Sequence, residues 1–264
     1  MGLLPAAVGP HLLHRRTAVI PAALRGVRGV VLDTDGVITD SARAHAAAWK
    51  QAFDAYLADH PAERPEQCRE FDVRVDYPRY VDGKSRLDGA AAFFASRGLR
   101  PPAGTVAAVA ADKERLFTER LAGGWIDAYP GTVRLLHVLR DEGIACAAAS
   151  ASRHARELLL HAEVLPLLDA VVDGGEAARL GLAGKPDPAL FLEAARRLGV
   201  SPVDAAVVED ALAGVEAGRR GGFGMVIGVD RSATAGMRSA LLRRGADIVV
   251  DDLEELLGDG GGRS

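Results

Sequence analysis

The chain has 264 residues, of which 48% are hydrophobic and 26% charged, and its formal net charge is −4. This length and hydrophobic content suffice for one large folded domain or two smaller ones. The acidic balance, without a basic stripe, disfavours a nucleic-acid binder. The two cysteines, Cys68 and Cys146, lie far apart in the sequence, so we expect neither a disulfide framework nor a cysteine metal site.

The first 24 residues begin apolar, contain Pro5 and Pro10, and only then reach Arg15 and Arg16. A secretion signal carries its positive charge before the apolar stretch, not after it. We therefore interpret residues 1–24 as an N-terminal extension, or as the result of a start codon placed too early. No apolar run reaches the roughly 18 residues that span a bilayer. We expect a cytoplasmic protein that does not contact membranes.

The first predicted strand, 29–32, is apolar and runs directly into Asp33 and Asp35. This pattern is typical of a buried parallel strand with a polar loop at its carboxyl end. A polar, irregular stretch covers 66–88. Predicted helices cover 42–58, 88–98 and 103–122.

This helical block separates the first strand from all the others. We therefore interpret 41–128 as an all-helical cap domain, inserted into a core domain made of 25–40 and 129–264.

From residue 129 onward, short apolar strands alternate with amphipathic helices. The predicted strands are 144–149, 170–172, 205–208, 224–229 and 247–250, and the predicted helices are 131–142, 153–162, 187–198, 211–220 and 235–244. This alternation predicts an α/β fold with a doubly wound parallel sheet. The glycine-rich end, 258–264, is predicted to be a flexible tail. Ligands of such folds bind at the carboxyl ends of the strands.

Two pairs of acidic residues lie at predicted strand ends. Asp33 and Asp35 point to the same side of an extended chain, so their carboxylates require a cation or a raised pKa. Glu209 and Asp210 add carboxylates at a second strand end, and such oxygen-rich sets suit Mg²⁺. The alternatives are an acidic loop that caps the next helix and solvated acids at a helix N-terminus.

Ser150 and Lys185 are candidates for holding an anion. Ser150 ends a strand just before a helix, where its hydroxyl and backbone N–H groups can bind an anion or serve as an ordinary N-cap. Lys185 is one of only four lysines, in Gly-Lys-Pro-Asp-Pro. Its compact ammonium suits a position between a carboxylate and a phosphoryl oxygen. The surrounding residues match neither a P-loop nor a dinucleotide-binding fingerprint.

In this order along the chain, Asp33-Thr34-Asp35-Gly36-Val37, Ser150, Lys185 and Glu209-Asp210 resemble the four motifs of the haloacid dehalogenase-like superfamily of phosphotransferases. The resemblance covers nearly the whole chain from about residue 27. With His45, Trp49 and 184–188 added, the sequence is similar to the β-phosphoglucomutase-like subgroup. The resemblance implies a core with a helical cap inserted after the first motif.

The resemblance also implies roles for the core residues. Asp33 would be the nucleophile that forms an aspartyl phosphate, and Asp35 the general acid and base. The phosphoryl group would be held by Ser150, Ala151 and Lys185. Mg²⁺ would bind Asp33, the backbone carbonyl of Asp35, and Asp210, with Glu209 in or near its shell.

The cap would supply specificity by the same resemblance. Arg86 would bind a distal phosphate, while His45 and Lys113 would couple substrate binding to cap closure. Alternatives are a helix-surface histidine at 45, a solvated lysine at 113 and simple cap packing for Trp49. The substrate-binding candidates are His45, Trp49, Gly83, Lys84, Ser85, Arg86, Lys113, Ser152, Arg153 and His154.

The function implied is Mg²⁺-dependent conversion of β-glucose 1-phosphate to glucose 6-phosphate through a bisphosphate. The alternative is a phosphatase that hydrolyses a sugar phosphate or a related small phosphometabolite. A non-catalytic binding module on this fold is a third hypothesis, and the complete set of acidic residues argues against it. A true dehalogenase would not need the magnesium cluster. We expect a phosphorylated small molecule as the partner, and a monomer.

Overall fold

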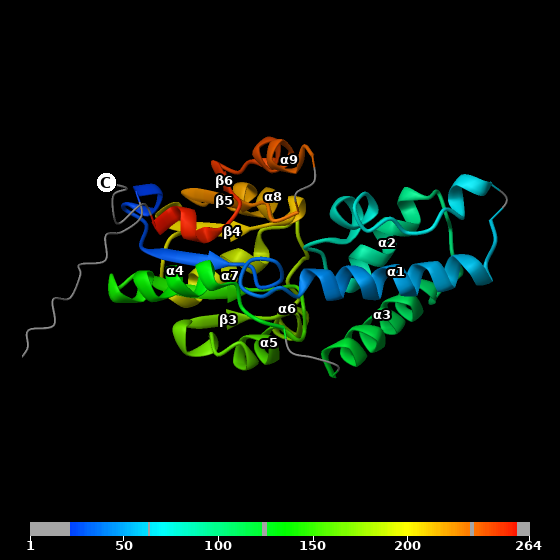
Figure 1. The fold of residues 1–264 in the computed structure, drawn as a ribbon, viewed down its shortest axis with the longest axis horizontal. Helices are drawn as coiled ribbons and strands as arrows, with labels where there is room; N and C mark the ends of the chain where they lie inside the picture. The colour runs from blue at the N-terminus through cyan, green and yellow to red at the C-terminus, as the bar shows by residue number, and fades with distance from the viewer. Residues whose placement is uncertain (1–21, 63, 123–125, 233–234, 258–264) are drawn as a thin grey trace, which may run out of the picture.

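The computed structural model describes residues 22–257 except 63, 123–125 and 233–234. Figure 1 shows two lobes side by side, one a sheet with helices around it and the other made of helices. No helix in the described part of the chain is long and apolar enough to cross a membrane.

Six parallel strands form one sheet in the order β3-β2-β1-β4-β5-β6. They are β1 (Gly29–Leu32), β2 (Ala145–Ala149), β3 (Ala170–Val172), β4 (Ala205–Glu209), β5 (Met225–Val229) and β6 (Ile248–Val250). β1 is central, and its last residue, Leu32, lies opposite Ala148 of β2 and Val208 of β4. Because the strands are parallel, the loops that follow β1, β2 and β4 are neighbours at one edge of the sheet.

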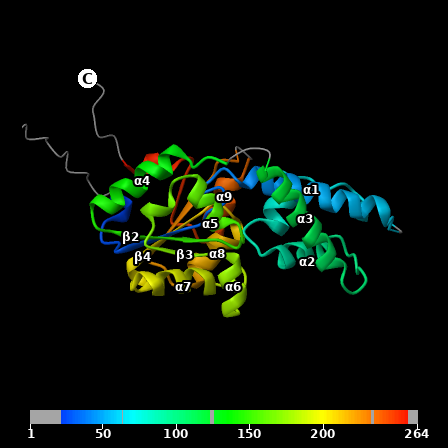
Figure 2. The ribbon, with the colours of Figure 1, turned by 90° about the horizontal axis from the view of Figure 1, so that it is seen from below.

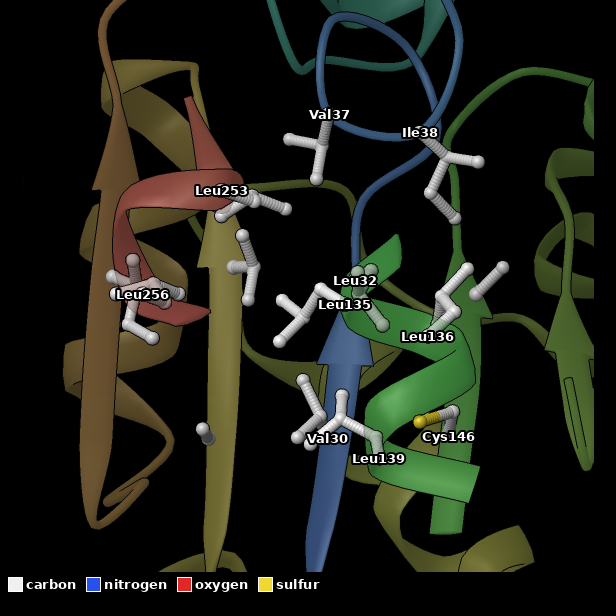
Figure 3. Close-up of a cluster of buried hydrophobic side chains, with 14 of the residues drawn as sticks. Val30, Leu32, Val37, Ile38, Leu135, Leu136, Leu139, Cys146, Leu253 and Leu256 are labelled. Atoms are coloured by element: carbon white, nitrogen blue, oxygen red, sulfur yellow. The ribbon is translucent and has the colours of Figure 1, made fainter. Parts of the chain in front are cut away.

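Helices cover both faces of the sheet (Figures 1 and 2). They are α4 (Pro130–Asp141), α5 (Ala155–His161), α6 (Gly174–Leu180), α7 (Ala189–Leu198), α8 (Leu212–Arg220) and α9 (Met237–Arg244). Leu135 and Leu139 of α4 pack on Val30 and Leu32, as Figure 3 shows. Val31, whose side chain points the opposite way, belongs to a second cluster with residues of α7 and α8. The predicted doubly wound α/β core is therefore confirmed.

The helical cap has a hydrophobic cluster of its own. Its helices are α1 (Ala42–Asp59), α2 (Arg86–Ser96) and α3 (Thr105–Ala122). Phe53 of α1 is fully buried at the centre, with the rings of Phe71, Phe93 and Phe94 around it. Leu158 of α5 also belongs to this cluster, so the cap packs against the core.

Three features differ from the expected elements. Helix α6 was not expected, because its sequence begins with two glycines; Asp173 stabilises its start by accepting hydrogen bonds from Gly175 and Glu176. The expected irregular stretch 66–88 contains a π-helical turn, Tyr77–Val81, and the first residues of α2.

The third difference concerns the N-terminal extension. Residues 1–21 lie outside the described residues, as does the predicted tail 258–264. Leu24, the last residue of the predicted extension, is fully buried in the same cluster as α4. Its packing extends the core beyond the predicted start at residue 25.

Candidate active site

The loop after β1 places Asp33 at the carboxyl edge of the sheet. The backbone N–H of Asp33 donates to the carbonyl of Val208 at 2.9 Å, so pairing with β4 continues one residue past the strand. The N–H of Asp35 then donates to the Asp33 carboxylate at 2.9 Å. Gly36 turns the chain with a φ of +85°, and a Cβ there would lie 1.8 Å from Oδ2 of Asp210. The acidic loop and the loop after β4 therefore touch at a glycine.

Lys185 is buried between two carboxylates. Its Nζ lies 2.5 Å from Oδ1 of Asp33 and 2.6 Å from Oε1 of Glu209. The other oxygen of Glu209 accepts from the backbone N–H of Ala211 at 2.6 Å. Burial disfavours the charged lysine, but the attraction of Asp33 and Glu209 outweighs it and raises the pKa of Lys185.

Asp35 is held by groups from the cap and from the core. Its carboxylate accepts hydrogen bonds from Ser41, at the start of α1, and from Ser150, after β2, the latter at 3.2 Å. Nε2 of His45 lies 3.2 Å from Oδ1 of Asp35, but it is not aligned for a hydrogen bond. Burial would raise the pKa of Asp35, yet His45, the Ser41 hydroxyl and Lys113 together lower it.

His45 in turn contacts Lys113 of α3. Nζ of Lys113 lies 2.7 Å from Nδ1 of His45, whose ring stacks on Phe117 with centroids 3.8 Å apart. Burial lowers the pKa of Lys113 to about 8. It also lowers the pKa of His45, with a further contribution from the charge of Lys113. Both residues are less than a tenth exposed, which removes the surface alternatives considered for them.

Asp210 is the carboxylate in this cluster without a hydrogen-bond donor among the described residues. Burial raises its pKa well above the usual value, and the nearby charges of Asp82, Glu209 and Asp33 raise it further. The pKa of Asp33 is raised for the same reasons, although Lys185 opposes this. A cluster with this excess of buried negative charge fits a divalent cation.

Within the described residues, no three His, Cys, Asp or Glu side chains are arranged to hold a metal. The carboxylates of Asp33, Asp35 and Glu209 all accept hydrogen bonds from protein groups, whereas that of Asp210 does not among the described residues. The resemblance implies Asp33, Asp210 and the Asp35 carbonyl as ligands, and the predicted four-residue metal set stays a prediction.

A cavity of about 550 Å³ opens between the sheet edge and the cap. Of the predicted residues, those that line it are Asp33, Asp35, His45, Trp49, Gly83, Lys84, Ser85, Arg86, Lys113, Ala151, Ser152, Arg153, Lys185 and Asp210. The lining residues do not include Ser150, His154 and Glu209. Each of these three contacts a residue that does line the cavity. Trp49 both lines the cavity and stacks on Phe53, so its packing role and its site position coexist.

The loop before α2 brings the cap close to the core. Gly83 has a φ of +70°, and a Cβ there would lie 2.8 Å from Cβ of Ala211. Ser85 caps α2 by accepting from the N–H of Asp88 at 3.2 Å. Lys84 donates to the carbonyl of Tyr80 at 3.0 Å. The cap loop is thus placed against the loop that carries Asp210.

Sequence reasoning missed several residues that line the cavity, and Tyr77, Asp82 and Glu114 are among them. Burial, with a smaller contribution from Glu209, raises the pKa of Asp82 to about 7, and the nearby Tyr77 and Lys185 oppose this rise. Oε1 of Glu114 lies 2.9 Å from Arg86 and 3.1 Å from His154. Asp82 directly precedes Gly83, and Glu114 directly follows Lys113, so their neighbours in sequence were the available signals.

Comparison with known proteins agrees with this geometry. The family model described as haloacid dehalogenase-like hydrolase matches residues 27–222. The chain is 40% identical to a β-phosphoglucomutase of Mycobacterium bovis over 88% of its own length and 92% of that protein. It is 27% identical to a phosphorylated carbohydrates phosphatase of Thermotoga maritima, over 88% of this chain and 97% of that one.

A solved structure of a β-phosphoglucomutase from Clostridium difficile has the same fold, with a TM-score of 0.70 at 24% identity, over 87% of this chain and 93% of that one. The family model covers well over half of the chain, and the relative at 40% identity covers almost all of it. The protein is therefore an enzyme of the haloacid dehalogenase-like hydrolase family, in its β-phosphoglucomutase-like subgroup.

Proposed function

We propose that the protein catalyses Mg²⁺-dependent phosphoryl transfer through an aspartyl phosphate on Asp33, converting β-glucose 1-phosphate to glucose 6-phosphate. One observation carries this proposal. A single cavity is faced both by the acidic cluster around Asp33 and by a cationic group that includes Arg86 and Arg153. A sugar with phosphates at two positions complements both groups at once, and the cavity volume lies in the usual range for such ligands.

Asp33 would carry the phosphoryl group between the two steps of the reaction. In the phosphorylated enzyme, the 6-hydroxyl of β-glucose 1-phosphate attacks the phosphorus, the bond to Asp33 breaks, and Asp35 accepts the hydroxyl proton. The bisphosphate that forms then reorients in the site, so that its 1-phosphate faces Asp33. Asp33 attacks the 1-phosphate, the bond to the sugar oxygen breaks, and Asp35 returns its proton to that oxygen.

Lys185 would neutralise charge on the transferring group, together with Ser150 and the backbone near Ala151. Bound Mg²⁺ would supply further charge neutralisation on the phosphoryl oxygens, held by Asp33, Asp210 and the Asp35 carbonyl. The ionised state of Asp35 in the ligand-free site suits its first task, which is to accept a proton.

The contacts of Asp35 link the acid and base to the cap. Ser41 and His45 reach Asp35 from α1, and Lys113 contacts His45 from α3. A cap displaced from the core would remove these groups from Asp35. This arrangement supports a mutase, because proton transfer would occur only when the cap excludes water.

The similarity to a phosphorylated carbohydrates phosphatase keeps hydrolysis of a sugar phosphate as the second candidate. Phosphorus NMR separates the two functions. Purified protein is mixed with Mg²⁺, β-glucose 1-phosphate and a trace of glucose 1,6-bisphosphate. We expect glucose 6-phosphate to form without free phosphate. Free phosphate would establish the phosphatase instead, and no reaction would contradict the proposed substrate.

A further inference from the structure

The cavity contains a carboxylate where a bound anion would be expected. Glu114 of α3 contacts two donors with one oxygen: Nη1 of Arg86 at 2.9 Å and Nε2 of His154 at 3.1 Å. Arg86 belongs to the cap and His154 precedes α5 of the core. This single oxygen therefore joins cap to core and lies between an arginine and a histidine.

The surrounding charges favour an anion at this position. Hydrogen bonding to Glu114 is the main cause of the raised pKa of His154, and Glu157 contributes through a 3.3 Å contact with Nδ1. The His154 hydrogen bond likewise lowers the pKa of Glu114 to about 2, with Arg86 and Lys113 adding to the effect. Glu114 is thus ionised throughout the neutral pH range. It accepts from Arg86 and His154, donors that would also suit a phosphate oxygen.

Glu114 is also open to exchange. Its side chain is 25% exposed and lines the cavity, and that of Arg86 is 28% exposed. An incoming phosphate dianion would be repelled by Glu114 while attracted by Arg86 and His154. Both anions cannot share the same two donors at full strength, because adjacent negative charges destabilise each other.

We propose that Glu114 is a specificity-determining residue, a resident anion that the second phosphate of a phosphosugar displaces from Arg86 and His154. This inference rests on the proposed function, which gives the ligand its second phosphate. Ligands without an anionic far end cannot exchange with Glu114. Glu114 therefore weakens the binding of ligands whose second phosphate takes this position. It leaves the binding of ligands without such a phosphate unchanged.

The test compares Glu114→Gln with the wild-type protein on two substrates at neutral pH. We expect the KM for β-glucose 1-phosphate, assayed with glucose 1,6-bisphosphate, to fall about fivefold while kcat is unchanged, because the competing charge is gone. The KM for a small aryl phosphate, which lacks a distal anion, should stay the same. Glu114→Ala provides a second variant if the glutamine form folds poorly.

Glu157→Gln is the matched control. It removes the other carboxylate beside His154 and leaves the Glu114–Arg86 contact intact, so the KM should not fall. Glu114→Asp, which keeps the charge, should not show the gain either. An unchanged or increased KM for the phosphosugar in both Glu114→Gln and Glu114→Ala would overturn the inference, since Glu114 would then only orient Arg86.

The wild-type assay separates this result from failure of the proposed function. If wild-type protein converts the phosphosugar and the variants show no gain, the function stands and the inference is wrong. If wild-type protein acts on the aryl phosphate but on no phosphosugar, the proposed function is wrong and the inference fails with it.

Discussion

At the level of single residues, Lys185 and the two carboxylates beside it form a buried cluster in the candidate site. Glu209 is fully buried, and its two oxygens are used by Lys185 and by the N–H of Ala211. Glu209 therefore orients the lysine, and the lysine orients Asp33. Removal of Lys185 would leave two buried carboxylates without their cation, which is costly.

Replacing Asp33 with asparagine should remove phosphoryl transfer and leave the fold intact. The amide is nearly the same size but cannot form the aspartyl phosphate, so activity should fall at least about 10³-fold. Turnover and a thermal melt of the same preparation test this. Lys185 still has Glu209, so we expect a folded protein. Wild-type turnover, with contaminating enzyme excluded, would contradict the assignment of Asp33.

Two glycines with the same φ angle allow the close contact at Gly36 to be tested. Gly36 and Gly26 both have a φ of +85°, but a Cβ at Gly26 meets nothing within 4 Å, whereas at Gly36 it would collide with Asp210. In both alanine variants the free energy of unfolding should fall by about 1 kcal/mol because of backbone strain. Only Gly36→Ala should also lower kcat/KM, by about tenfold or more, because Asp210 must move. Equal activity in the two variants would show that the contact does not matter.

Among whole elements, the strands and most helices were predictable because their apolar residues repeat with a period of two or 3.6. The resemblance predicted that Asp33, Lys185 and Glu209 lie close together. The parallel sheet contributes because the carboxyl ends of β1 and β4 are neighbours. Helix α6 was missed, since its Gly-Gly start hides the capping by Asp173. Glu114 contacts Arg86 and His154, which are distant in sequence, so its neighbour Lys113 could indicate a place near the cavity but not these contacts.

Helix α2 presents Arg86 from its first turn, and this position should matter for specificity. Arg86→Ala should reduce kcat/KM for β-glucose 1-phosphate by about 10- to 100-fold, since a charged hydrogen bond to the distal phosphate is lost. Use of a small aryl phosphate should change little. Arg115→Ala is the control, because Arg115 is an exposed arginine of the cap helix α3. An equal loss on both substrates would remove Arg86 from specificity.

For the molecule as a whole, the acidic cluster predicts that Mg²⁺ stabilises the fold more at higher pH. Burial raises the pKa of Asp33 and Asp210 well above 3.8, the ordinary value for an aspartate side chain. As the pH rises past that value, the unfolded chain releases these protons while the metal-free folded chain retains them. The stability of the metal-free protein therefore falls with increasing pH.

Binding of a divalent cation offsets this loss of stability at high pH, and removal of the cation by a chelator brings the loss back. The increase in Tm on adding Mg²⁺ to chelator-treated protein should be larger near pH 8 than near pH 5, by about a few degrees. Asp210→Asn should reduce both the increase and its pH dependence. An increase of the same size at both pH values in the wild-type protein would contradict the assignment of this cluster.

The central position of β1 has a consequence for synthesis on the ribosome. Gly29 of β1 pairs with Ala145 and Ala205. During translation, β1 therefore cannot pair until strands more than a hundred residues later have been synthesised. The cap is translated during this interval, and most of its hydrophobic cluster is its own. The nascent chain can thus fold its cap first, while the apolar strand that precedes Asp33 stays unpaired and open to chaperones.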